Sequence, residues 1–467
     1  MITKGASNRL THAAVCMALG VFMQLTPLAN AAPAADKAER AQNVIILIGD
    51  GMGPSHFYAT HLYSEHVLKH ELNISRLMNA GFTAYVHNET ADSVVTESAA
   101  AAGQIATGQP MVVRAISMAP DGKTPVPTIA ELAKAKGKSV GLVTTSGITD
   151  ATPAGFAAHV AKRSEEHIIA EQEIQANVDV LMGGRKKFFL PESEGGARKD
   201  GRNLLEEART KGYTVVQTAA ELQSAPQGKI LGLFNKNDLA HEMDRGATSE
   251  PSLTEMTEKA LQTLSRNKKG FIAMIEGGRI DHAAHRNDAA GVIRDTLEFD
   301  SAVGVAMEFA KNNPRTLVLV TADHETAGMA LIGHSKQSKE YVGMDFDAIR
   351  NVRASFEVIL QKFGKHPSPE TVRDVVRETM GIELTEEEAK TVANDTIRKL
   401  DPYNYTGDYL HSLGFVLRPY LRVGFGSQTH TASPIMLVAK GPGAAKVHGL
   451  MRNTEIFTVM KNALGLQ

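Results

Sequence analysis

Acidic and histidine side chains recur at the ends of short apolar runs in this chain. Asp50 follows "NVIILIG", Glu276 ends "FIAMIE", and Asp323 and His324 follow "TLVLVTA". One carboxylate in such a place can be a helix cap, but several carboxylates together with imidazoles are typical of a metal site. Oxygen ligands with a few histidines suit Zn²⁺ or Mg²⁺. The candidate ligands from this pattern are Asp50, Glu276, Asp281, His285, Asp323, His324 and His430.

The hexapeptide "IDHAAH" supplies two of these candidates. Asp281 and His285 are four residues apart, so both project from one face of a helical turn and can reach the same ion. Taken alone, the hexapeptide fits a surface helix turn equally well. The histidines of "HLYSEHVLKH" have a similar spacing, but they lie on a polar helix well past the strand that ends before Asp50, so we expect surface positions. They are His61, His66 and His70.

The stretch "DSVVTESAAAAGQIATG" places three hydroxyl groups before an alanine-rich helix. A helix N-terminus presents N–H groups and a positive dipole end to an anion, so a serine there would stand beside a bound phosphate. A helix cap without chemistry would have the same backbone geometry. The candidates are Ser93, Thr96 and Ser98.

The apolar runs also predict the fold that would position these groups. Continuous Val/Ile/Leu runs bounded by glycine or polar turns are typical of parallel strands buried on both faces. Helical patterns such as "TIAELAKAKGK" and "AAGVIRDTLEFDSAVGVAMEFAKNN" alternate with them. We therefore expect an α/β fold with a doubly wound, mostly parallel sheet flanked by helices, whose ligands lie at the carboxyl ends of the strands.

Residues 332–426 interrupt this alternation with charged helical patterns, as in "PETVRDVVRETMGIELTEEEAKTVANDTIRKL". We expect residues 43–331 and 427–467 to form the α/β catalytic domain, and residues 332–426 to form a mainly helical insertion near the active-site side. The insertion could be a lid, an interface or a solvated helical decoration.

The N-terminus predicts export. Lys4 and Arg9 precede an apolar stretch and the small-residue sequence "ANA", which is the pattern of a secretory signal peptide over residues 1–31, followed by a linker over 32–42. We expect a periplasmic or secreted protein with no membrane span. The only cysteine, Cys16, lies in that signal, which excludes disulfides in the mature chain and a cysteine-dependent sulfatase. A net charge of −2 does not favour nucleic-acid binding.

The chain resembles the alkaline phosphatases in motifs that occur in the family's order. These are "IGDGMG", "VTESAAAAGQIATG", "DATPAGFAAHVAKR", "EGGRIDHAAH", "TADHETAG" and "QTHTASP". The resemblance covers residues 43–328 and 427–467 and implies hydrolysis of a broad range of phosphate monoesters, in a family of homodimers. The family's serine nucleophile follows Thr-Asp and opens the alanine-rich helix, which favours Ser98, although Glu97 stands where the family has aspartate.

The resemblance further implies a site with two Zn²⁺ and one Mg²⁺. Asp281, His285 and His430 would hold one zinc ion, and Asp50, Asp323 and His324 the second, which would also bind the Ser98 oxygen. Asp50 would bridge to Mg²⁺, completed by Thr152 and Glu276, with Asp150 linked through water. Arg163 would clamp two phosphate oxygens, a bidentate task that suits a guanidinium. His282 stands where the family varies, and would contact phosphate through water.

Other functions remain open at this point. A phosphodiesterase or nucleotide pyrophosphatase on the same metal scaffold generally uses threonine, which would make Thr96 the nucleophile, and lacks the Arg163 clamp. A cofactor-independent phosphoglycerate mutase shares the scaffold, but an exported location argues against it. An exported metal- or phosphate-binding protein without turnover is the alternative that is not an enzyme.

Overall fold

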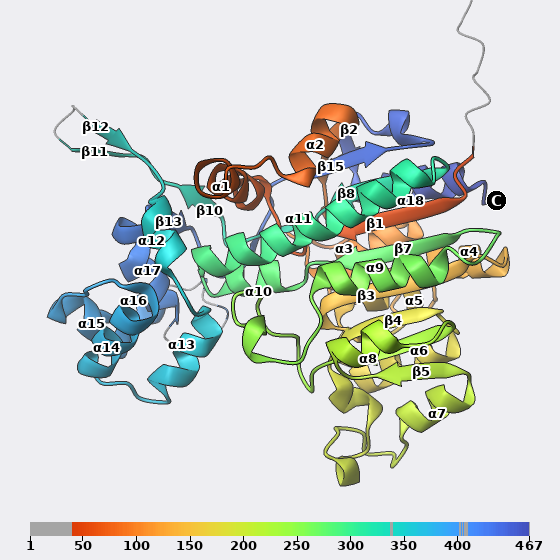
Figure 1. Ribbon diagram of the computed structural model, residues 1–467, viewed down its shortest axis with the longest axis horizontal. Coiled ribbons are helices and arrows are strands. Elements are labelled where there is room, and N and C mark those ends of the chain that lie inside the picture. The colour runs from red at the N-terminus through yellow and green to blue at the C-terminus, as the bar shows by residue number, and fades with distance from the viewer. Residues whose placement is uncertain (1–39, 337–339, 401–402, 404, 406–409, 467) are drawn as a thin grey trace, which may run out of the picture. The chain divides into compact units, whose positions relative to one another are not determined.

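The computed structural model describes residues 40–466, apart from 337–339, 401–402, 404 and 406–409. The predicted signal peptide, residues 1–31, and most of the predicted linker lie outside the described residues. The described chain is built on a ten-stranded sheet with the order β16-β2-β15-β8-β1-β7-β3-β4-β6-β5 (Figure 1). This sheet confirms the predicted α/β class.

The four central strands are the apolar runs of the sequence. They are β1 (Asn43–Ile48), β3 (Ser139–Gly147), β7 (Phe271–Glu276) and β8 (Thr316–Thr321). All four run parallel; Ile46, for example, lies opposite Met274 on one side and Leu319 on the other. Nearly every residue of these strands is buried, because helices cover both faces of the sheet. Parallel strands end at the same edge of the sheet, so the polar residues that follow them come together.

The outer strands include one that runs against the others. On one side, β4 (Val180–Gly184), β6 (Lys229–Leu233) and β5 (Tyr213–Val216) continue the parallel arrangement. On the other side, β15 (Ile435–Lys440) is antiparallel to both β8 and β2 (Phe82–His87), and β16 (Gly449–Arg452) pairs parallel with β2. The residues before β15, rather than those after it, therefore lie at the edge where the parallel strands end.

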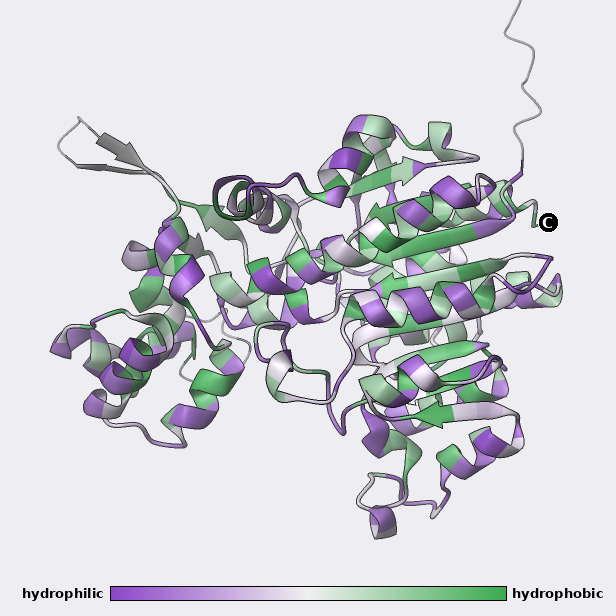
Figure 2. Ribbon diagram, in the orientation of Figure 1, coloured by the Kyte–Doolittle hydropathy of each residue, from purple (hydrophilic) through white to green (hydrophobic). Residues whose placement is uncertain are grey.

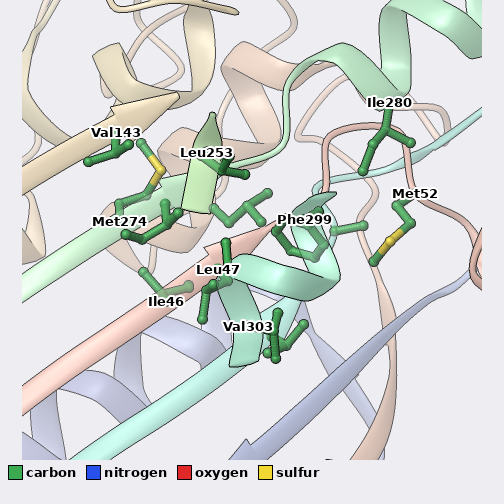
Figure 3. Close-up of a cluster of buried hydrophobic side chains, with 14 of the residues drawn as sticks. Ile46, Leu47, Met52, Val143, Leu253, Met274, Ile280, Phe299 and Val303 are labelled. Carbon is green, nitrogen blue, oxygen red and sulfur yellow. The ribbon is translucent and has the colours of Figure 1, made fainter. Parts of the chain in front are cut away.

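Helices α9 (Leu253–Leu264) and α11 (Ala289–Asn312) lie over the face of the sheet that points toward the viewer in Figure 1. Asp288 caps α11 by accepting a hydrogen bond from the Gly291 N–H at 2.8 Å. Figure 2 shows the central strands as largely hydrophobic and α11 as mixed, as expected for a helix with one buried face. In Figure 3, Phe299 and Val303 of α11 lie beside Leu47. Each fully buried side chain of this size contributes about 1.5–3 kcal/mol.

The remaining α-helices of the sheet region are α1 (Pro54–Tyr63), α2 (Asn73–Ala80), α3 (Ser98–Thr107), α4 (Ile129–Ala135), α5 (Ala151–Ala157), α6 (Glu166–Gln175), α7 (Leu204–Thr210), α8 (Ala219–Ser224), α10 (Arg279–His285) and α18 (Asn453–Leu464). Both helical patterns quoted from the sequence are helices in the structure, as α4 and α11. Within the described residues, no helix combines the length and apolar character that crossing a membrane requires.

The segment 332–426 contains α12 (Phe346–Asn351), α13 (Phe356–Phe363), α14 (Pro369–Met380), α15 (Glu386–Ala393), α16 (Thr396–Leu400) and α17 (Leu410–Leu421). It also contains short strands that the sequence did not predict: β11 (His334–Lys336) with β12 (Glu340–Val342), and β13 (Val423–Phe425), which pairs with β10 (Met329–Leu331). Helix α14 begins at a Ser-Pro pair, in which Ser368 accepts a hydrogen bond from the Thr371 N–H.

Candidate active site

The predicted ligands lie together at the edge of the sheet where the central parallel strands end. Asp50 follows β1, Glu276 is the last residue of β7, and Asp323 and His324 follow β8. His430 belongs to the two-residue strand β14 (His430–Thr431), which pairs with β9 (Glu325–Thr326) directly after His324. His430 precedes β15, and because β15 is antiparallel, this position lies at the same edge of the sheet.

The first cluster consists of Asp281, His285 and His430. Helix α10 presents Asp281 and His285 on one face, as the four-residue spacing predicts, with His285 Nε2 3.2 Å from Asp281 Oδ2. His430 Nε2 lies 3.1 Å from His285 Nε2 and 3.8 Å from Asp281 Oδ1. These contacts use both oxygens of Asp281, one for each imidazole. Donor atoms of Asp281, His430 and also His324 lie within 4.8 Å of one another, so this cluster could offer ligands to a metal ion together with His324.

Backbone carbonyls orient the two imidazoles of this cluster. His285 Nδ1 lies 2.5 Å from the carbonyl oxygen of Gln428, and His430 Nδ1 lies 2.9 Å from that of Thr96. A carbonyl only accepts, so each Nδ1 carries the proton and each Nε2 faces the cluster with a free lone pair. This is the tautomer that a metal ligand needs.

The second cluster consists of Asp50, Asp323 and His324. His324 Nε2 lies 3.5 Å from Asp50 Oδ1 and 3.3 Å from Asp323 Oδ2. Both of these carboxylate oxygens are buried and have no hydrogen-bond partner among the described residues. A buried carboxylate oxygen without a donor is costly, and a divalent cation would compensate it. The donors present therefore fit a metal ion.

A third group lies beside the second around Glu276, which is buried and accepts a hydrogen bond from Thr144. The Thr152 hydroxyl is also buried and has no partner within the described part of the chain. Burial raises the pKa of Glu276 to about 8, and burial together with Asp323, Asp281 and Glu276 raises that of Asp50. Several carboxylates buried close together can all be ionised only if cations neutralise their charge.

Among the three candidate hydroxyls, Ser98 faces these clusters. Its Oγ lies 3.3 Å from His324 Nε2, at the first residue of α3, and Ser98 lines the cleft. The Thr96 hydroxyl donates to the carbonyl of Glu97, and Ser93 Oγ accepts from the Val95 N–H in the preceding turn. The geometry therefore favours Ser98 as the nucleophile.

Glu97 caps the helix that Ser98 begins. Its carboxylate accepts hydrogen bonds from the N–H groups of Ala99 at 3.1 Å and Ala100 at 2.9 Å, and from that of Arg114 at 2.8 Å. The sequence predicted that free N–H groups at this helix end would face an anion. Two of them are instead satisfied by Glu97, because the glutamate side chain is long enough to fold back over the first turn.

Arg163 lies in the loop after α5, half-buried, between two carboxylates. Its Nη1 donates to Glu97 Oε2 at 2.7 Å and its Nη2 to Asp150 Oδ1 at 2.8 Å. Each Nη carries a second N–H, so the guanidinium can still donate to a phosphate from this position. Glu97, at the position of the family's aspartate, thus fixes Arg163. Asp150 bonds directly to Arg163, and its link to Mg²⁺ through water stays a prediction.

We expect Glu97→Gln to lower the free energy of unfolding by about 1–2 kcal/mol, because the amide loses the ion pair to Arg163 and part of the helix cap. Urea unfolding would measure this loss. Glu206→Gln is a control in the first turn of α7, where the carboxylate is exposed; it should change stability by no more than about 0.5 kcal/mol. Equal effects of the two substitutions would contradict the structural role of Glu97.

A cleft of about 790 Å³ opens over these groups, and several of its residues were not predicted. Tyr405 of the insertion stacks on the His285 ring at 4.0 Å between centroids. Arg279 Nη2 donates to Glu357 of α13 at 2.5 Å, and its Nη1 contacts His282 Nδ1 at 2.7 Å. His282 itself lines the cleft, as expected for a residue near a bound phosphate. The unpredicted lining residues include Arg185, Asn237, Asp238, Arg279, Arg286, Glu357 and Tyr405.

These residues carry no repeating pattern that sequence reasoning could have used. Arg185 does follow a buried strand, β4, and the same rule that selected Asp50 would have selected it. The histidines excluded from the site lie elsewhere. His66 and His70 are exposed, and His61 is partly exposed and bonds to Ser75 at 3.1 Å.

Comparison with known proteins shows the family that this chain resembles in sequence and fold. A model of the alkaline phosphatase family matches residues 41–466. Alkaline phosphatase 4 of Bacillus subtilis is 33% identical over 95% of this chain and 93% of its own length. Alkaline phosphatase of Escherichia coli is 31% identical over 91% of this chain and 87% of its own. The crystal structure of Thermus thermophilus alkaline phosphatase superimposes with a TM-score of 0.84 at 32% identity, covering 92% of each chain.

Proposed function

The chain belongs to the alkaline phosphatase family of phosphomonoesterases, and from this premise we propose that it acts through a phosphoserine intermediate on Ser98. One observation carries the proposal: Ser98 Oγ lies 3.3 Å from His324 Nε2, at the junction of the carboxylate and imidazole clusters. Ser98 Oγ would form the new bond to phosphorus as the ester oxygen leaves as an alcohol. A water molecule would then release inorganic phosphate and regenerate the serine.

We assign two zinc sites and one magnesium site to the donor groups. Divalent cations in such sites lower the pKa of a bound hydroxyl and stabilise negative charge on the oxygens of an in-line displacement. The buried oxygens of Asp50 and Asp323 without hydrogen-bond donors support this assignment. The first zinc site is Asp281, His285 and His430; the second is Asp50, Asp323 and His324; the magnesium site is Asp50, Thr152 and Glu276.

Arg163 would bind two oxygens of the phosphate. Glu97 and Asp150 hold its guanidinium from two sides, so little side-chain freedom is lost when phosphate binds. Ser98, the metal sites and Arg163 would all contact the phosphoryl group. The leaving alcohol would lie in the open part of the cleft, so a broad range of phosphate monoesters is expected. His282 would contact the phosphate through water.

We also propose that the protein is exported to the periplasm or the medium and forms a homodimer. The signal-peptide pattern over residues 1–31 supports export, and the resemblance to a family of homodimers supports the assembly. Cell fractionation with N-terminal sequencing, and light scattering of the purified protein, test the two statements separately.

The experiment that tests the proposed function compares two substrates. The purified protein should hydrolyse p-nitrophenyl phosphate at least about 100-fold faster than bis-p-nitrophenyl phosphate, because a diester leaves one of the phosphate-binding groups without a partner. Faster diester hydrolysis would favour a phosphodiesterase, with Thr96 as the nucleophile to test. Tight binding of inorganic phosphate without turnover of either substrate would identify a binding protein.

A further inference from the structure

Arg185 combines an unusual backbone conformation with a place in the cleft wall. It lies between β4 and the short helix η2 (Lys186–Phe189), with φ 59° and ψ 35°. This left-handed region favours glycine, since a Cβ there crowds the following carbonyl. The Arg185 N–H donates to the carbonyl of Asn237 at 2.7 Å. The fold thus keeps an arginine where glycine would be the least strained residue.

The aliphatic part of the Arg185 side chain crosses the end of β3 at Gly147. A Cβ at Gly147 would lie 2.1 Å from Arg185 Cδ and 2.3 Å from its Cγ. Only a residue without a side chain leaves room for this path. The route of Arg185 toward the site therefore depends on glycine at position 147.

The guanidinium of Arg185 ends among three carboxylates. Its Nη2 donates to Asp150 Oδ2 at 2.9 Å, its Nη1 to Glu166 Oε2 at 3.0 Å, and its Nε to Asp238 Oδ1 at 2.8 Å. The other oxygen of Asp150 accepts from Arg163. Asp150 is thus held from both sides by arginines, of which one is the proposed phosphate ligand.

These contacts form a chain of alternating charge that leads to the nucleophile. Arg185 holds Asp150, Asp150 holds Arg163, and Arg163 pairs with Glu97, which caps the helix that begins at Ser98. Asp150 is one of the two carboxylates that hold Arg163, and the position of Asp150 depends in turn on Arg185. Glu166 and Asp238 fix Arg185 in turn, so its position is determined by three ion pairs.

We propose that Arg185 is a positioning residue, which orients Asp150 so that Asp150 holds Arg163 in place to bind phosphate. This inference rests on the proposed role of Arg163. Arg185 does not touch the phosphate in this account. Its effect on phosphate binding passes through the Asp150 carboxylate.

The test is Arg185→Gly, because glycine removes the guanidinium and relieves the left-handed backbone at the same time. We expect the inhibition constant of inorganic phosphate and the KM for p-nitrophenyl phosphate to rise about tenfold. The melting temperature should fall, because three carboxylates lose their ion-pair partner, whereas the metal content should stay unchanged. Arg185→Lys should recover part of the loss, since it restores a positive charge but can serve fewer of the three carboxylates.

Two further variants make the test specific. Arg422→Gly is the matched control, because Arg422 also has a positive φ, 55°, and its Nη1 lies 3.5 Å from Asp345 in the insertion. It should leave phosphate inhibition unchanged. In an Asp150→Asn background, Arg185→Gly should change phosphate inhibition by less than about twofold, because the residue through which it acts is already altered.

Three results would overturn the inference. These are an unchanged inhibition constant in Arg185→Gly, an equal rise in Arg422→Gly, and a full tenfold rise in the Asp150→Asn background. The last would mean that Arg185 binds phosphate directly or acts through Glu166 or Asp238. Failure of the proposed function is distinguishable, since the unaltered protein would then not prefer the phosphate monoester.

Discussion

Replacing Ser98 with alanine should reduce hydrolysis of p-nitrophenyl phosphate by at least about 10³-fold. Ser98 Oγ lies 3.3 Å from His324 Nε2, and alanine removes this oxygen, which would bond to phosphorus. The side chain is small and makes no helix cap, because Glu97 performs that function. The melting temperature and bound metal should therefore stay close to those of the unaltered protein.

The neighbouring hydroxyls provide the controls. Ser93→Ala should keep full activity, since its hydroxyl accepts a hydrogen bond only within its own turn, from the Val95 N–H. Thr96→Ala should lose little, because its hydroxyl donates to a backbone carbonyl. Acid-quenched protein should carry phosphate covalently in the unaltered chain and not in Ser98→Ala. An active Ser98→Ala with an inactive Thr96→Ala would reassign the nucleophile and favour the phosphodiesterase alternative.

Much of the candidate site could be predicted because parallel strands share one edge. Apolar runs end before Asp50, at Glu276 and before Asp323. If these runs are parallel strands, their shared direction alone is enough to place the three ends at one edge of the sheet. Asp281 and His285 could be predicted as a pair for a similar reason, since helix periodicity alone places them on one face. His430 was harder: it precedes its strand, and only the antiparallel direction of β15 explains why that position reaches the same edge.

The outer part of the site could not be predicted, because loops and long-range ion pairs build it. Arg185 reaches Asp150 over the backbone of Gly147, a contact set by two loops whose conformations have no sequence period. Glu357 and Tyr405 enter from the insertion, and their places depend on how its helices pack. The cap formed by Glu97 was missed for another reason: at this position the resemblance suggested only a departure from aspartate.

Exhaustive chelation should abolish phosphatase activity, and Zn²⁺ with Mg²⁺ should restore it. Donor atoms of Asp50, Asp323 and His324 lie within 4.8 Å of one another, and a shared cation is what makes the ionised forms of the two carboxylates compatible. The expected loss is at least about 10³-fold, since metal ions supply the main stabilisation of charge in such reactions. Full activity after chelation, with metal analysis demonstrating that the ions were removed, would exclude the metal sites.

Removing the metal ions by chelation should make the free energy of unfolding depend on pH in a defined direction. Burial raises the pKa of Glu276 to about 8 and that of Asp323 to about 7, while in the unfolded chain the pKa values of the two carboxyls lie near their ordinary values of 4.5 and 3.8. Between these limits the two carboxyls bind more protons in the folded chelated protein than in the unfolded chain. Their contribution to the free energy of unfolding should therefore fall as the pH rises from about 4 to about 8, by a few kcal/mol per group.

Protein reconstituted with Zn²⁺ and Mg²⁺ should not follow this course, because the cations hold the carboxylates in their ionised form. The difference in melting temperature between reconstituted and chelated protein should thus be larger at pH 8.5 than at pH 5.5, measured after the chelator is removed. Chelated Glu276→Gln is the matched control: it lacks one titrating carboxyl, so its stability should fall less over the same range. A difference that is equal at both pH values, or a chelated Glu276→Gln whose stability changes with pH as much as that of the chelated unaltered protein, would contradict crowding of buried carboxylates as the reason this site needs metal ions.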